Sequence, residues 1–249
     1  METNWLADVI ILHLPHASTV LPKEIEFLLD DEALAYEVDS MTDHSTDRLF
    51  DLPGAHRCIF PVSRLVVDPE RFLADKMESV GMGAVYTGTS NGQRLRTISN
   101  EERLELINTY YHPHHAKFTR MVDDQLEQHG RCLIIDCHSF PAQPLPYELD
   151  RNRPDICIGT DTYHTSAKLK NCLSKAFEAS GYRVAIDSPF SGSIVPLKHY
   201  QLDRRVSSVM IEVNRSLYAD PLGFARVQSD LSHATSQAAA IGRYKKSGE

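Results

Sequence analysis

The chain has 249 residues, of which 42% are hydrophobic and 24% charged, and its formal net charge is −8 at pH 7. This composition is typical of a globular protein and excludes fibrous and extensively disordered chains. We expect no nucleic-acid partner and no membrane-surface partner, because both usually require a basic face. The sequence has no run of about 18 apolar residues. Its N-terminal residues do not form a basic stretch followed by a long apolar one. We therefore expect a cytoplasmic protein without a membrane span or secretory signal.

Short apolar runs alternate with helical patterns along the first part of the chain. Proline residues delimit them, because proline removes a backbone donor from a ladder or a helix. Pro15 is expected to stop the first strand, and Pro61 to interrupt the second apolar run. In chain order we predict a strand over 8–14, one or two helices over 22–39, the start of a helix over 45–51, one or two strands over 57–68 and a loop over 81–92.

Residues 99–130 give the clearest helical signal. Ser99 and Glu102 have the spacing of a capping box, and Gly130 is expected to end the helix. Pro113 lies inside the pattern and should kink it. The residues that repeat at helical spacing are Leu104, Ile107, Tyr111, His115, Phe118 and Val122.

The second half of the chain continues the alternation of strands and helices. We predict strands over 131–137, 155–159, 182–186 and 207–213, helices over 161–181 and 220–244, and a frayed tail over 245–249. Strands that alternate with helices favour one α/β domain, spanning 1–249, with a mostly parallel mixed sheet flanked by helices.

The cysteines do not predict a disulfide framework. Their number is odd, and no Cys-x-x-Cys pair occurs. We expect reduced, mostly buried side chains in a cytoplasmic protein. The cysteines are Cys58, Cys132, Cys137, Cys157 and Cys172.

Polar side chains follow three of the predicted strands. His16, His138 and Glu212 each lie at the carboxyl end of an apolar run, which is where open α/β sheets bind their ligands. Two imidazoles and a carboxylate with one open position form the ligand set of catalytic zinc. Asp43 or Asp47 offers an alternative carboxylate ligand, and Glu212 would then be free to act as a base. Taken singly, each of these residues also has a structural interpretation, as a turn cap, a hydrogen-bonded core histidine or an ion-pair partner.

Arginine and further histidine residues add a second set of candidates. Arg64 lies inside a predicted strand, where it must pair with an acid such as Asp68 or grip a substrate carboxylate. Arg71 offers a second grip or a surface charge. We interpret His115 as a satisfied histidine on the apolar face of the long helix, and His112 and His114 as solvent-facing or supporting groups, not as metal ligands.

These residues occur within motifs that resemble the N-formylglutamate amidohydrolase family, whose fold is related to the zinc-dependent carboxypeptidases and aspartoacylases. The matching pieces follow the family's order from residue 15 to about residue 218. They are residues 15–18, Thr42-Asp43, Asp47-Arg48-Leu49, residues 63–68 with Arg71, Tyr110 with Pro113 and His115, and residues 136–140, 153–160 and 211–213.

The resemblance implies a zinc-exopeptidase-like fold and a metal-dependent hydrolase of an acidic N-acyl amino acid such as N-formyl-L-glutamate, acting in amino-acid degradation such as histidine catabolism. It implies His16, Asp43 and His138 as ligands of Zn²⁺ or another divalent metal, and Glu212 as the general base. Arg64 and Arg71 would bind the substrate carboxylate or stabilise the oxyanion, and Ser139 would contact a ligand or the substrate. Two positions depart from the family pattern: Ser18 replaces a glycine, and Glu70 replaces an asparagine.

Three other functions remain open at this point. One is a carboxypeptidase or N-acyl amino-acid deacylase of the same superfamily, with the same catalytic residues and a different pocket. Another is a cysteine amidase that uses Cys137, although Cys137 and His138, as neighbours in a strand, should point to opposite faces. The third is an inactive metal-binding homologue. The sequence does not predict the oligomeric state.

Overall fold

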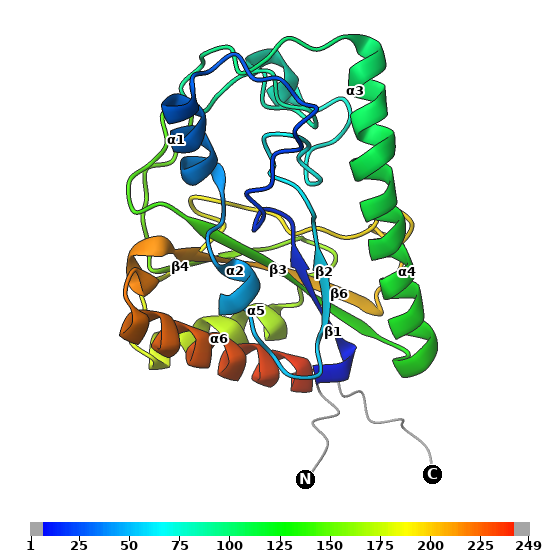
Figure 1. Ribbon diagram of the computed structural model, residues 1–249. Coiled ribbons are helices and arrows are strands. Elements are labelled where there is room, and N and C mark those ends of the chain that lie inside the picture. The colour runs from blue at the N-terminus through cyan, green and yellow to red at the C-terminus, as the bar shows by residue number, and fades with distance from the viewer. Residues whose placement is uncertain (1–6, 242–249) are drawn as a thin grey trace, which may run out of the picture.

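The computed structural model describes residues 7–241 as one α/β domain around a six-stranded sheet (Figure 1). The strand order is β2-β1-β3-β6-β4-β5, and only the pairing of β4 with β6 is antiparallel. This confirms the predicted mostly parallel mixed sheet. The strands are β1 (Ile10–Leu14), β2 (His56–Ile59), β3 (Cys132–Phe140), β4 (Ile156–Gly159), β5 (Val184–Ile186) and β6 (Val206–Asn214).

Helices cover both faces of the sheet (Figure 1). Alternate residues of β1 face opposite layers, because successive side chains of a strand point to opposite sides. Leu12 packs in the cluster that α5 and α6 complete, whereas Ile11 packs against Phe118 and Val122 of α4. The helices are α1 (Asp31–Met41), α2 (Thr46–Leu49), α3 (Asn100–Leu106), α4 (His112–His129), α5 (Ala167–Ala179) and α6 (Pro221–Ile241).

The long helix predicted over 99–130 is present as α3 and α4 joined by a π-helical turn, Ile107–Tyr111. Ser99 and Glu102 form the predicted capping box, and Gly130 ends α4 in a left-handed conformation. Pro113 lies just after the π-helical turn, in the first turn of α4. Proline has no N–H to donate to the helix, and the helix widens into the π-helical turn just before it. The widened turn lies where we predicted a kink.

Two predicted ranges each overlap one element, α1 for 22–39 and β2 for 57–68, over only part of their length. Residues 22–30 form no helix, because Leu28 N donates to Leu95 O (2.8 Å) and not to a carbonyl of its own segment. Asp30 is the N-cap of α1, so the helix begins only at Asp31. Residues 62–68 form no second strand: beyond Pro61 the chain turns, and Val66 N donates to Ser63 O (2.9 Å). Arg64 consequently lies in a loop, not in a strand.

The remaining predicted elements are present with shifted ends. The helix predicted from residue 161 begins only at Ala167, because Asp161 first accepts the N–H groups of Tyr163 and His164 in a turn. The last helix, α6, is described to Ile241, so the predicted end at residue 244 and the tail over 245–249 lie outside the described residues. The five cysteines are free thiols, of which Cys172 alone is not fully buried. Within residues 7–241, no helix is long and apolar enough to cross a membrane.

Candidate active site

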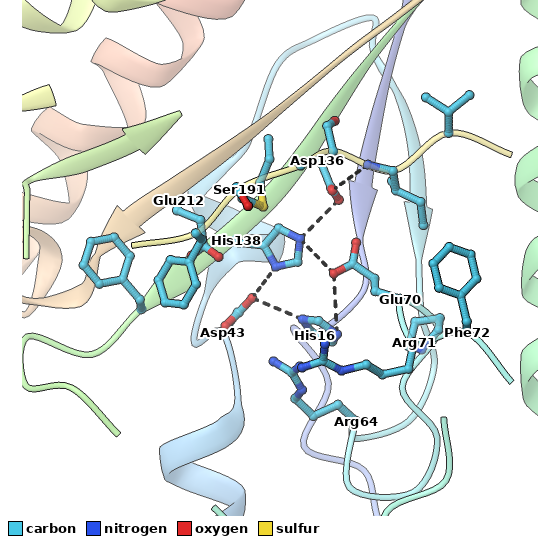
Figure 2. A pocket seen from close by; sticks show the side chains of 18 of the residues that line it. His16, Asp43, Arg64, Glu70, Arg71, Phe72, Asp136, His138, Ser191 and Glu212 are labelled. Atoms are coloured by element: carbon cyan, nitrogen blue, oxygen red, sulfur yellow. Dashed lines mark hydrogen bonds and ion pairs between the residues drawn. The ribbon is translucent and has the colours of Figure 1, made fainter. Parts of the chain in front are cut away.

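The candidate site lies at the carboxyl edge of the adjacent parallel strands β1, β3 and β6. His16 follows β1, His138 lies in β3, and Glu212 in β6 is the register partner of His138. These three side chains and Asp43 line one cavity of about 970 Å³, and Figure 2 shows them directed toward its centre. The structure thus brings together side chains that are up to 196 positions apart in the sequence, between His16 and Glu212.

His16 is held between two carboxylates. Its Nε2 donates to Asp68 Oδ1 (2.9 Å), and its Nδ1 lies 3.7 Å from Asp43 Oδ2. The backbone N–H of Asp43 also donates to the carbonyl of His16 (2.9 Å), which fixes the loop after α1 beside the end of β1. His16 Nδ1 is buried and makes no hydrogen bond to any described residue. One nitrogen of the ring is therefore oriented by an acid, and the other is an unsatisfied lone pair directed at Asp43.

His138 also lies between two carboxylates, but both of its ring nitrogens are within hydrogen-bond distance of an acid. Its Nε2 donates to Asp136 Oδ1 (3.2 Å), while its Nδ1 lies 3.0 Å from Asp43 Oδ2. The same oxygen of Asp43 therefore faces the Nδ1 atoms of both His16 and His138. A carboxylate behind each imidazole is the arrangement that orients metal-binding histidines in proteins.

Asp43 is the acid placed between the two imidazoles. It is 3% exposed, and its second oxygen accepts from Arg215 Nη2 (3.4 Å). Burial disfavours its charged form, but the hydrogen bond from His138 and the adjacent His16 ring lower its pKa far below the ordinary value. Asp47 lies on α2 with its backbone carbonyl accepting from Arg57, and it is not part of the cavity lining that the structure describes.

The donor set at this point suits a divalent cation. Imidazole nitrogens and a carboxylate oxygen are the ligands that zinc takes in catalytic sites, and iron, cobalt and manganese accept them also. The buried, unsatisfied Nδ1 of His16 supports the fit, since an ion there would satisfy an atom that burial otherwise leaves unpaired.

Glu212 is the second carboxyl group of the cavity predicted from the sequence. It is 7% exposed, and its Oε2 is buried without a hydrogen-bond partner among the described residues. Burial raises its pKa to about 8 against the opposing charge of His138 and with the help of the Asp43 and Glu70 charges. An acid with an unpaired oxygen and a pKa near neutrality has the properties of a proton-transfer group.

Arg64 and Arg71 converge on Asp68. Arg64 Nη2 contacts Asp68 Oδ2 at 2.7 Å, Arg71 Nε lies 3.8 Å from the same oxygen, and the Tyr86 hydroxyl donates to it (3.0 Å). The predicted ion pair of Arg64 with Asp68 is therefore present, and both arginines also line the cavity. Asp68 links the two arginines to His16, because its Oδ1 accepts a hydrogen bond from His16 Nε2.

Ser139 lies next to His138 in β3 and is 4% exposed. Its hydroxyl accepts from Arg215 Nε (3.2 Å), and Arg215 also donates to the carbonyl of Ser40 (3.0 Å). The sequence analysis did not single out Arg215. Its position just after the last predicted strand was the only signal that could have indicated it.

Glu70 and Asp136 are further acids whose role the sequence analysis missed or left open. Glu70 Oε2 lies 3.2 Å from His138 Nε2 and 3.9 Å from His16 Nε2. Asp136 contacts His13 as well as His138, and His13 Nε2 lies 3.0 Å from His114 Nε2. The interpretation of His114 as a possible solvent-facing residue is wrong, because its ring is buried under His13.

His114 and His115 both have lowered pKa values. Burial, with smaller contributions from neighbouring charges, lowers the pKa of His114 to about 2 and that of His115 to about 4. His115 is only half-buried and donates to the carbonyl of Pro69 (2.8 Å). His115 is thus a satisfied histidine, as predicted, although it is only partly buried, and His114 is the more deeply buried of the two.

Cys137 does not have the environment of a nucleophile. It is 1% exposed, packs in the cluster that α5 and α6 cover, and its thiol donates to the carbonyl of Ile135. Burial raises its pKa well above the ordinary value for a thiol. Thiolate formation is therefore opposed, which disfavours the cysteine amidase considered from the sequence.

Comparisons with known proteins support the predicted family. A family model for N-formylglutamate amidohydrolase matches residues 9–219. In solved structures, the chain is similar to an N-formylglutamate amidohydrolase from Ralstonia eutropha JMP134, with a TM-score of 0.79, 22% identity and coverage of 95% of both chains. A gene product from Agrobacterium tumefaciens is similar with a TM-score of 0.73 and 19% identity, over 96% of this chain and 94% of that one. No curated protein matches the sequence.

The family match extends over most of the chain and includes the predicted site residues from His16 to Glu212. It defines a hydrolase that acts on amide carbon–nitrogen bonds. The chain belongs to the N-formylglutamate amidohydrolase family.

Proposed function

We propose that this hydrolase is metal-dependent and cleaves the N-formyl, or another N-acyl, amide of an acidic amino acid such as N-formyl-L-glutamate. The observation that carries the proposal is the position of Asp43 Oδ2, 3.7 Å from His16 Nδ1 and 3.0 Å from His138 Nδ1. Both rings have their other nitrogen bound to an acid. A role in amino-acid degradation, including histidine catabolism, is part of this proposal.

His16 and His138, through their Nδ1 atoms, and Asp43 are the residues that would hold the metal. When bound, a zinc ion supplies Lewis acidity that makes hydroxide available from water at neutral pH. Asp68 and Asp136 keep the Nε2 protons on the two rings, because carboxylates accept them. Both Nδ1 atoms face Asp43, so an ion held beside Asp43 would be bound by their lone pairs in place of the proton that His138 Nδ1 donates to Asp43 in this structure.

Glu212 is the residue proposed to move the proton. In its charged form, its unpaired Oε2 accepts the proton of the attacking water, and the resulting acid then gives that proton to the leaving amine nitrogen. Placement on the central strand β6 holds the carboxyl group beside His138 throughout both transfers. General acid–base catalysis of this kind contributes about 10²–10⁴-fold to the rate.

Arg64 and Arg71 are proposed to bind the substrate carboxylate and to stabilise the developing oxyanion, with Ser139 as a polar contact of the substrate. Asp68 holds Arg64 in place at 2.7 Å, so the guanidinium is preorganised. The cavity of about 970 Å³ is at the upper end of small-molecule sites. That volume favours one alternative, a deacylase of the same superfamily with a larger acyl group.

Removal of the metal tests the proposal directly. We expect purified protein treated with a chelator to lose deformylation of N-formyl-L-glutamate, and added Zn²⁺ or another divalent ion to restore it. Elemental analysis before and after chelation measures the ion content, and formate release measures the activity. Full activity at zero ion content would contradict metal dependence, and restored metal binding without activity on any N-acyl amino acid would indicate an inactive homologue.

Arg64→Ala tests the recognition of an acidic substrate. We expect KM to rise about 10-fold or more for N-formyl-L-glutamate, because the variant loses a charge-assisted hydrogen bond worth about 1.5–3 kcal/mol. KM for N-formyl-L-leucine should change little. Arg64→Lys keeps the charge and loses the fork geometry, so its effect should be intermediate. Steady-state kinetics on both substrates separates the two roles, since an equal rise for both would make Arg64 structural.

A further inference from the structure

A second group of ligand atoms lies behind the proposed metal site. His13, Glu70 and Asp136 each offer one donor atom, and these atoms all lie within 4.8 Å of one another. His13 Nδ1 is 2.9 Å from Asp136 Oδ1 and 3.6 Å from Glu70 Oε1. Tetrahedral ligands that are each about 2.1 Å from a zinc ion are themselves about 3.4 Å apart. The two distances from His13 Nδ1, 2.9 and 3.6 Å, lie on either side of this value, so the three atoms are close enough together to reach one ion.

The charges of this group are not balanced by arginine or lysine. Among the described residues, the ion pairs of Glu70 and Asp136 are made only with His13, His16 and His138. By contrast, Asp43 and Asp68 each contact an arginine. Glu70 Oε1 is also buried and makes no hydrogen bond. The buried Asp136 and the partly buried Glu70 therefore face a site where the positive charge must come from a proton on histidine or from a cation.

The scaffold positions this second group rigidly. His13 of β1 and Asp136 of β3 are register partners in the parallel sheet, and Asp136 Oδ2 accepts from the backbone N–H of Ile194 (3.1 Å). The His13 ring stacks on Phe118 with a centroid distance of 4.7 Å, and its Nε2 meets His114. His13 Nδ1 contacts Asp136 Oδ1 (2.9 Å) and its Nε2 contacts His114 Nε2 (3.0 Å). An ion bound at Nδ1 would take the place of the proton there, and the ring could then donate from Nε2 to His114.

We propose that His13 Nδ1, Asp136 and Glu70 bind a second divalent cation, separate from the ion assigned to His16, Asp43 and His138. One imidazole and two carboxylates suit zinc, cobalt or manganese. His138 lies between the two sites, because its Nδ1 faces Asp43 while its Nε2 contacts both Asp136 and Glu70.

Metal stoichiometry tests the proposal without any activity assay. Chelated protein is loaded with excess Zn²⁺, desalted to remove ions held weakly at the surface, and analysed for zinc per chain. We expect two ions in the wild-type chain, and one in each of His13→Gln, Glu70→Gln and His16→Asn. His115→Gln is the matched control, a nearby histidine outside both groups, and should keep two. The double variant His13→Gln/His16→Asn should keep none.

The outcomes separate this proposal from the proposed function. One ion in the wild-type chain, unchanged in His13→Gln, overturns the second site alone and makes His13 the protonated partner of Asp136. No ion overturns both proposals. Two ions that persist in Glu70→Gln place the second ion elsewhere and also overturn the assignment. Glu70 lies in a loop and its side chain is 20% exposed, so this variant remains informative if the buried His13→Gln fails to fold. Zinc anomalous scattering in a crystal would place each ion.

Discussion

Glu212→Gln is expected to reduce kcat on N-formyl-L-glutamate by about 10²–10⁴-fold, while the protein keeps its fold and its metal. Glutamine has the size and shape of glutamate but cannot accept a proton from water. The side chain is fully surrounded by protein, and one of its oxygens has no hydrogen-bond partner among residues 7–241. The substitution therefore removes the proton acceptor without breaking a hydrogen bond of that oxygen.

Glu37→Gln is the matched control for this variant. Glu37 is 2% exposed and accepts from the backbone and hydroxyl of Ser90, outside the cavity lining. We expect it to lower the free energy of unfolding and to leave kcat of the folded enzyme within about 2-fold, as for a site away from the reacting groups. A Glu212→Gln enzyme with kcat as high as this control would remove Glu212 as the base.

His138→Ala is expected to lose one metal ion per chain and nearly all turnover. His138 contacts Asp43 through one ring nitrogen and Asp136 and Glu70 through the other. Its removal takes away an imidazole ligand and leaves three buried acids without that partner. Elemental analysis of the purified variant, together with formate release from N-formyl-L-glutamate, measures both losses.

The exposed His233 on α6 provides the control for the loss of a histidine as such. His233→Ala should retain the metal content and the activity of the wild-type chain. If His138→Ala also retained its full metal content, then His138 would not be a ligand, and the assignment of Asp43 between the two imidazoles would lose its basis.

The fold could be predicted from the sequence where apolar runs are bounded by clear breakers. The strands β1, β3, β4 and β6 and the long helix with its Ser99–Glu102 box follow such signals. Residues 22–30 and 62–68 could not be predicted, because their apolar side chains pack in clusters formed with distant loops and with residues of α1, α3 and the π-helical turn. Phe27 and Val66 belong to small clusters outside the sheet, and such tertiary contacts override local propensity.

The candidate site was predicted only in part, for a physical reason. Strand ends indicate where His16, His138 and Glu212 converge, since parallel strands share a carboxyl edge. They do not indicate which acid lies behind which imidazole. Asp68 pairs with His16 across 52 positions, and Asp136 with His13 across 123. His13 itself has the sequence environment of an ordinary strand interior, so its contacts with two acids could not be anticipated.

The groups of the site divide between two kinds of support. His13, Asp136, His138 and Glu212 stand on strands of the central sheet. Arg64, Glu70 and Arg71 belong to the connection between β2 and the long helix, which tolerates sequence change far better than a buried ladder does. Substitutions in this connection would therefore alter the groups proposed to bind the substrate and leave the strand that carries Glu212 unchanged.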